Sequence, residues 1–106
     1  MNKQELNNNK DTKAINLLNP EHIIRIEALS NYSKLYLTNA RPIVMSKVLH
    51  WFEDRLPNQL FARVHRSHLV NKMFAKEIIG TQNKTLILNT GECISMSRRL
   101  RKALVL

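Results

Sequence analysis

Short segments with the two-residue alternation of β-strands recur along this chain, and they limit the folds it can adopt. Residues 34–38 (KLYLT) alternate polar with apolar side chains, and a run rich in isoleucine precedes them at residues 23–29. Residues 85–88 (TLIL) and 92–96 (ECISM) flank the turn sequence Asn-Thr-Gly. A period of two places alternate side chains on one face of a strand, and a short Gly-containing link is typical of an antiparallel hairpin. The sequence therefore predicts a mostly β fold.

The remaining segments complete a mostly β domain with short helices. Further strands are predicted at residues 42–45, 60–64, 68–70 and 76–79. Residues 47–56 instead carry apolar side chains at spacings of three and four, with Ser46 as candidate N-cap and Pro57 as the stop signal. Trp51 and Phe52 on this helix are expected to pack in the core. A second helix is predicted for residues 97–104, with basic side chains opposite its apolar face.

The chain has 106 residues, which suits one domain with a single modest core. Residues 1–19 are rich in Asn and Lys and are predicted to be a flexible lead-in, followed by the domain at residues 20–106. No apolar run approaches the roughly 20 residues of a membrane span, and the N-terminus lacks the apolar core of a signal peptide. The single cysteine, Cys93, cannot form an internal disulfide. We expect a cytoplasmic protein without membrane contact.

The sequence contains few residues that could support catalysis or hold a cofactor. Cys93 lies in a predicted strand without a neighbouring base and is expected to be a packed core thiol. His65 and His68 are three residues apart, but in an extended or turned segment without a second cysteine nearby, so we expect no metal site. The only two glycines cannot form a phosphate-binding loop. Glu53 and Asp54 are adjacent on a solvated helix face. We expect neither an enzyme nor a small-molecule substrate or cofactor.

The charge of the chain indicates a polyanionic partner. It has 17 Lys and Arg residues against 8 Asp and Glu residues, a formal net charge of +9. The excess is C-terminal, because residues 55–106 hold ten basic side chains and only two acidic ones. Such an excess is also compatible with a generally solvated basic surface. Composition alone therefore leaves both an anion-binding face and a solubilising surface open.

Two basic clusters stand out within this half. They consist of Arg63, His65, Arg66 and Ser67, and of Ser97, Arg98, Arg99, Arg101 and Lys102. Lys and Ser side chains suit phosphate contacts, whereas the two-pronged guanidinium of Arg matches guanine in the major groove. Arg66 or Arg99 would therefore suit base reading. Alternatively, each of these cations packs its aliphatic stem against the sheet and only covers the surface.

Residues 61–71 (FARVHRSHLVN) closely resemble the signature of LytTR-type DNA-binding domains, in which an aromatic residue, an Arg, an HRS triplet and a VN pair recur at this spacing. Four further features agree in order, so that the resemblance spans about residues 20–104. These features are IIRIEALSNYSKLYL at 23–37, the Ser-led helix before Pro57, TLILNTGECISM at 85–96 and SRRLRKAL at 97–104. The departures are His68, where Tyr or Phe is usual, Leu100, where Tyr is common, and residues 72–74, which break a more regular apolar pattern.

The resemblance implies an elongated antiparallel β-sheet or sandwich that inserts loops, rather than a recognition helix, into successive major grooves of duplex DNA. Base-facing positions would be residues 31–34, Arg66 beside His65, and Arg99, with Ser67, Arg98 and Lys102 near phosphates. The full set of expected contact residues is Asn31, Tyr32, Ser33, Lys34, Arg63, His65, Arg66, Ser67, Ser97, Arg98, Arg99 and Lys102.

The function implied by the resemblance is that of a transcriptional regulator or of a response-regulator effector domain. One copy would bind each half-site, and a second copy would occupy a repeated site. The alternative is an RNA-binding or protein-interaction module that uses the same basic face. Readers of single-stranded RNA usually present several stacking aromatics, of which this chain has few outside its predicted core.

Overall fold

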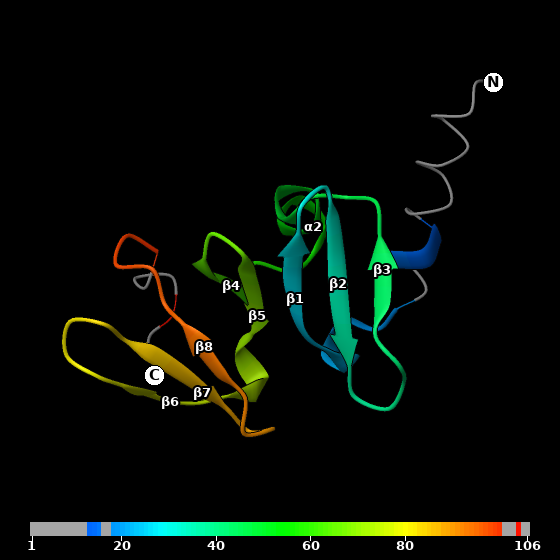
Figure 1. Cartoon of the computed structure of the whole chain (residues 1–106). Coiled ribbons are helices and arrows are strands. Elements are labelled where there is room, and N and C mark those ends of the chain that lie inside the picture. The colour runs from blue at the N-terminus through cyan, green and yellow to red at the C-terminus, as the bar shows by residue number, and fades with distance from the viewer. Residues whose placement is uncertain (1–12, 16–17, 101–103, 105–106) are drawn as a thin grey trace.

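The computed structural model describes residues 13–15, 18–100 and 104, and it contains two antiparallel sheets flanked by short helices (Figure 1). The first sheet has five strands in the order β3-β2-β1-β5-β4, and the second has three in the order β6-β7-β8. The predicted mostly β class is confirmed. The strands of the first sheet are β1 (Ile23–Leu29), β2 (Tyr32–Leu37), β3 (Ile43–Met45), β4 (Phe61–His65) and β5 (His68–Asn71).

One face of the first sheet forms the larger core. Leu35 lies opposite Ile26 on β1 and opposite Ile43 on β3, so these side chains share a face. Helix α2 (Leu49–Arg55) covers this face, and its Phe52 is fully buried among them. Burial of such a side chain stabilises the fold by about 1.5 to 3 kcal/mol. The core packing expected of Phe52 is therefore observed, and the edge of the Trp51 ring packs against it.

The second sheet packs on the opposite face of β4 and β5. Its strands are β6 (Ala75–Ile79), β7 (Thr85–Leu88) and β8 (Cys93–Ser95), and Gly91 in the β7–β8 turn has a positive φ of +91°. Val64 and Val70 from the first sheet meet Leu86 and Ile94 from the second in a separate buried cluster. Strands β4 and β5 therefore lie between two cores and couple the two sheets.

Asn71, the last residue of the signature segment, is fully buried at the end of β5. Its amide nitrogen donates hydrogen bonds to the Ile23 carbonyl at 2.9 Å and, more weakly, to the Pro20 carbonyl at 3.4 Å. Its side-chain oxygen accepts from the Met73 amide and thereby caps the 3₁₀ turn η2 (Lys72–Phe74). A second 3₁₀ turn, η1 (Pro20–His22), leads into β1. The Asn of the signature thus ties β5 to the start of β1.

The beginning of α2 differs from the prediction. The N-cap is Val48 rather than Ser46, and it makes no side-chain capping bond. Val48 belongs to the apolar pattern of residues 47–56, but it is 53% exposed because it precedes the first helical turn in an extended conformation. The helix therefore starts two residues later than the cap signal at Ser46 indicated, and Ser46 is a wrong prediction.

Cys93 is exposed, so its predicted burial is wrong. Strand β8 alternates, and its buried positions are Ile94 and, just beyond its end, Met96. Cys93 has the opposite parity and therefore points away from the core. Counting alternate positions along the strand from Ile94 and Met96 would have predicted that Cys93 faces outward.

Both ends of the chain also depart from the prediction where they are described. Residues 13–15 of the predicted lead-in are helical, and Ile15 is buried in the larger core, so this part is packed on the domain. Residues 98–100 form a turn instead of the predicted helix, and Leu104 is not helical either but is buried in the smaller core. Lys102 and Arg101 lie outside the described residues.

Candidate nucleic-acid interface

The turn between β4 and β5 is held from within by Arg63. Its guanidinium donates to the carbonyls of His65 at 3.0 Å and Arg66 at 2.5 Å, and it forms an ion pair with Glu53 on α2. The Arg63 side chain is only 23% exposed. Arg63 is therefore occupied in shaping the turn, which leaves the exposed Arg66 side chain at its tip. Glu53, expected to be merely solvated, fixes this arrangement to α2.

Two further hydrogen bonds fix the same turn. The Ser67 carbonyl accepts from the Ala28 amide of β1 at 2.9 Å. The Ser67 amide donates to Nδ1 of His65 at 3.0 Å, so in the neutral His65 ring the proton lies on Nε2. Backbone and His65 side chain thus hold Ser67 in place. The turn is attached to β1 as well as to its own strands.

The turn between β1 and β2 lies at the same end of the sheet, because β1 and β5 run antiparallel with Glu27 opposite His68. Asn31 is exposed there, and Tyr32 is 51% exposed. Ser33 is fully buried, and its hydroxyl donates to the Lys47 carbonyl at 2.6 Å. As a DNA contact Ser33 is therefore a wrong prediction, since its side chain faces the core. Lys34 is partly exposed, with its ammonium 5.1 Å from the Tyr36 ring centre.

The third segment, residues 97–100, lies beside the β4–β5 turn. The Ser97 amide donates to the Val64 carbonyl at 2.8 Å, which fixes the segment to β4. Arg98 and Arg99 are exposed beyond this anchor. An open hollow of about 400 Å³ separates the two segments. It is lined by Glu53, Arg63, Arg66, Ser97, Arg99 and Leu100.

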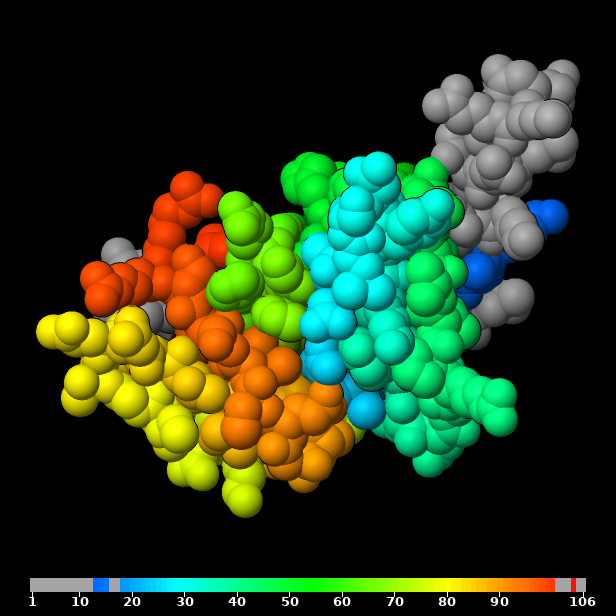
Figure 2. All heavy atoms as spheres, in the orientation of Figure 1, coloured from blue at the N-terminus to red at the C-terminus, as the bar shows by residue number. Residues whose placement is uncertain are grey.

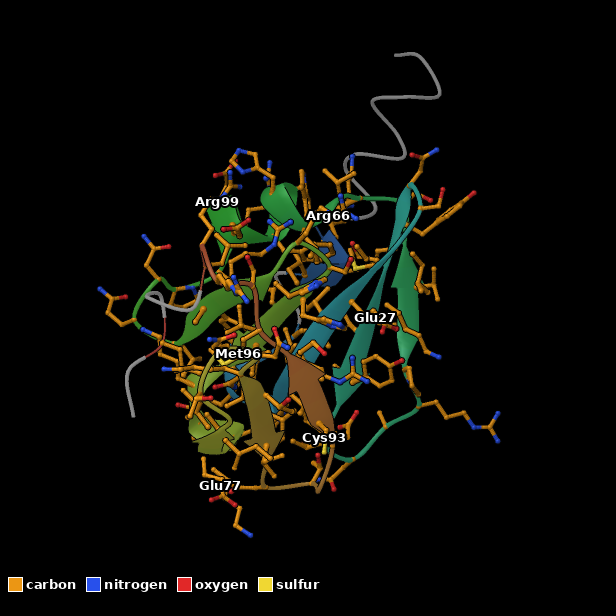
Figure 3. All side chains as sticks on the ribbon, turned by 60° about the vertical axis from the view of Figure 1, so that its left-hand side comes forward. Glu27, Arg66, Glu77, Cys93, Met96 and Arg99 are labelled. Atoms are coloured by element: carbon orange, nitrogen blue, oxygen red, sulfur yellow. The ribbon has the colours of Figure 1, made fainter. Side chains whose placement is uncertain are left out.

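The structure brings these three segments to one end of the molecule. Figure 2 shows residues 97–100, the β4–β5 turn and the β1–β2 turn in succession along its upper edge. In Figure 3, Arg66 and Arg99 lie at one end, and Glu77 of the second sheet lies at the other. The β1–β2 and β4–β5 segments are hairpin turns, and helix α2 lies at the same end of the first sheet (Figure 1). Cationic side chains therefore gather on a row of loops.

His68, at the start of β5, is half-buried beside His65, with the ring centres 5.4 Å apart. Its Nδ1 atom is buried without a hydrogen-bond partner. Burial lowers the pKa of His68, and the neighbouring Arg25 and His65 act in the same direction, whereas Glu27 opposes them. His68 therefore favours the neutral form in the fold. In the described residues, no group of three His, Cys, Asp or Glu side chains could hold a metal ion.

A sequence model of the LytTr DNA-binding domain matches residues 13–106. The chain belongs to the LytTR DNA-binding domain family. A similar solved structure is described as the LytTr DNA-binding domain of a methyl-accepting/DNA response regulator from Bacillus cereus. It is 24% identical with a TM-score of 0.74, and the match covers 84% of this chain and 86% of that chain. At this identity the likeness establishes the fold. A search of curated proteins finds no match.

Membership in the LytTR family confirms the resemblance predicted from residues 61–71 and indicates DNA binding in transcription regulation. The coarse fold expected of a LytTR domain is confirmed as well. In the described part of this LytTR domain, no helix is long and apolar enough to cross a membrane.

Sequence reasoning missed one buried charged residue of this LytTR domain. Arg25 on β1 is only 8% exposed, and it bonds to Glu92 in the β7–β8 turn. The only signal was its place between Ile24 and Ile26 in an otherwise apolar run. The two partners are 67 residues apart in sequence, so no local pattern links them.

The lowered pKa of His68 predicts a pH-dependent stability for this LytTR domain. The unfolded chain takes up the proton at the ordinary pKa of 6.5, whereas the folded chain does so only at lower pH. The stability from neutral His68 is thus complete above that value and is lost as pH falls through the folded pKa. We expect the melting temperature to fall less for His68→Phe than for the wild type between about pH 7.5 and about pH 5.5. Equal falls would show that His68 is not the titrating group.

Proposed function

We propose that this domain binds specific duplex DNA sequences as the effector part of a transcriptional regulator, and that its three loop segments enter successive major grooves. The observation that carries this proposal is the position of Arg66 and Arg99 around one hollow at the loop end of the molecule. We further propose a cytoplasmic location for the domain, since its proposed partner is duplex DNA.

The proposal assigns base reading to Arg66 and Arg99 and phosphate contacts to Ser67 and Arg98. A guanidinium can donate two parallel hydrogen bonds to guanine, and both Arg66 and Arg99 are exposed. The turn residue Asn31 suits an adenine edge or a phosphate. Arg63 was predicted to contact DNA. We assign it the role of a positioning residue instead, because its guanidinium is already bonded within the protein.

Loop insertion is favoured over a recognition helix by the burial of α2. This helix has seven residues, and it buries Leu49 and Phe52 against the first sheet. A helix that reads a groove has to present its side chains outward over several turns. The two hairpin turns, in contrast, present the residues at their tips outward. We further propose that one copy covers one half-site and that a second copy binds a repeated half-site.

RNA binding through the same face has less support. Single-stranded RNA is usually read by several exposed aromatic side chains on a sheet. Among the described residues of the three loop segments, Tyr32 is the one exposed aromatic. Because these segments offer a single side chain for stacking on bases, duplex DNA is favoured over single-stranded RNA as the partner.

A competition titration tests the proposed function. Duplexes selected from a random pool supply a cognate sequence, and binding is then compared with single-stranded DNA and RNA of that sequence at two salt concentrations. We expect the cognate duplex to bind most tightly, with an affinity that falls steeply with salt because phosphate contacts release counterions. A preference for either single strand would overturn duplex recognition.

A further inference from the structure

Arg25 forms a partly buried contact between the two sheets. From β1 its Nε donates to Oε2 of Glu92 at 2.9 Å, and its Nη2 lies 2.7 Å from the same oxygen. The guanidinium also stacks on the Tyr36 ring, with Cζ 3.8 Å from the ring centre. The Tyr36 hydroxyl donates to Glu27, which lies 3.8 Å from Nη1 of Arg25. The Arg25 guanidinium is thus held by β1 and β2 of the first sheet, and it is joined to the β7–β8 turn of the second sheet.

Glu92 is itself held in place within the β7–β8 turn. The Thr90 hydroxyl donates to its Oε1 at 2.9 Å, and the Glu92 carbonyl accepts from the Leu88 amide at 2.9 Å. The carboxylate therefore presents its other oxygen to Arg25 from a fixed backbone. A cleft of about 490 Å³ lies beside this pair, between β1 and β8, so side chains do not fill the space around it. Glu27 and Cys93 line this cleft, and in Figure 3 Glu27 lies near the middle of the molecule and Cys93 lower, toward Glu77.

In the described part of the chain, turn η2 links β5 to β6, and two specific polar contacts join the sheets at the two ends of β8. One is the hydrogen bond from Ser97 to Val64, and the other is the Arg25–Glu92 ion pair. The apolar cluster between them couples the sheets through side-chain packing. One polar contact adds a directional constraint at one point. A second contact at the far end of β8, about five residues or 17 Å away, constrains the relative orientation of the sheets at a second point.

We infer that Arg25 and Glu92 are positioning residues that set the orientation of residues 97–100 relative to the two hairpin turns. The inference rests on the proposed function. Strand β1 leads directly into the β1–β2 turn, and β8 leads directly into residues 97–100. The ion pair therefore joins the strands that carry the first and third contact segments. The pair is partly buried, and such pairs contribute little net stability, so we assign it a role in orientation.

Residual dipolar couplings of backbone amides measure the orientation of the two sheets directly. Glu92→Gln removes the charge but keeps the size of the side chain. Its matched control is Glu77→Gln, an exposed carboxylate on β6 of the same sheet. We expect a single alignment tensor to fit both sheets in the wild type and in the control. In Glu92→Gln the second sheet should require its own tensor of smaller magnitude.

Binding to the selected duplex is measured on the same proteins. We expect Glu92→Gln to lose about tenfold in affinity for the cognate duplex, since the third segment then has to be oriented during binding. Affinity for unrelated duplexes should not change. Glu77→Gln should match the wild type in both measurements. If loss of one charge prevents folding, Arg25→Met combined with Glu92→Gln removes both charges and is expected to give the same result.

Two results would overturn the inference. They are an unchanged tensor in the charge-free variants, whatever their affinity, and a changed tensor with unchanged cognate affinity. A wild type that prefers no duplex would instead overturn the proposed function. The dipolar couplings would still decide whether Arg25 and Glu92 orient the sheets.

Discussion

Replacing Arg66 with alanine should weaken cognate duplex binding by about 1 to 3 kcal/mol, and replacing Arg99 should have an effect of the same size. Both side chains are exposed at the loop end, and both line the hollow between the β4–β5 turn and residues 97–100. Loss of either guanidinium removes a two-pronged donor. Because the two line one hollow, the double variant need not equal the sum of the single ones. Equilibrium titration of the selected duplex measures each loss.

The matched control is Arg41→Ala. Arg41 is an exposed cation in the loop between β2 and β3, at the end of the first sheet opposite the contact turns (Figure 1). Its replacement changes the net charge by the same amount but should leave the preference for the cognate sequence intact. If Arg66→Ala binds the cognate duplex as tightly as the wild type, the placement of this residue in the interface is wrong.

Asn71→Ala should lower the free energy of unfolding by about 2 to 3 kcal/mol, because buried hydrogen-bonding groups lose their partner. The change leaves the Ile23 carbonyl and the Met73 amide without their side-chain bonds. Chemical denaturation measures the loss. The exposed Asn39 supplies the control, since Asn39→Ala should change stability by less than about 0.5 kcal/mol. A loss for Asn71→Ala as small as that of the control would contradict the structural role of this amide.

The Asn71 prediction also explains part of the family signature in physical terms. The segment FARVHRSHLVN contains residues that we propose face DNA and residues that shape the turn. Arg66 is exposed, whereas Arg63 and Asn71 are committed to contacts within the protein. The motif thus combines a proposed recognition residue with the local structure that presents it.

The strands could be predicted because their pattern is local. Alternation and turn residues located the β7–β8 hairpin and the β4–β5 turn close to their observed positions. The same rule would have corrected two errors. Ser33 is two residues from the buried Leu35 on β2, and Cys93 is next to the buried Ile94 on β8. Their side chains therefore had to face inward and outward, respectively.

The contacts that organise the interface could not be predicted in this way. The Arg63–Glu53 pair joins a strand to a helix, and the Arg25–Glu92 pair joins the two sheets across 67 residues. Such pairs depend on how the sheets pack, and the spacing of apolar residues along the sequence carries no information about that packing. The sequence marked where cations gather, and the fold determined which of them are free to bind.

Mapping backbone amide chemical shifts during titration with the selected duplex tests most directly whether the three loop segments form the DNA interface. The largest changes should fall on residues 31–32, 66–67 and 97–99, with little change in the loop between β6 and β7 at residues 80–84. Changes centred on that loop, with residues 66–67 and 97–99 unaffected, would contradict the proposed interface.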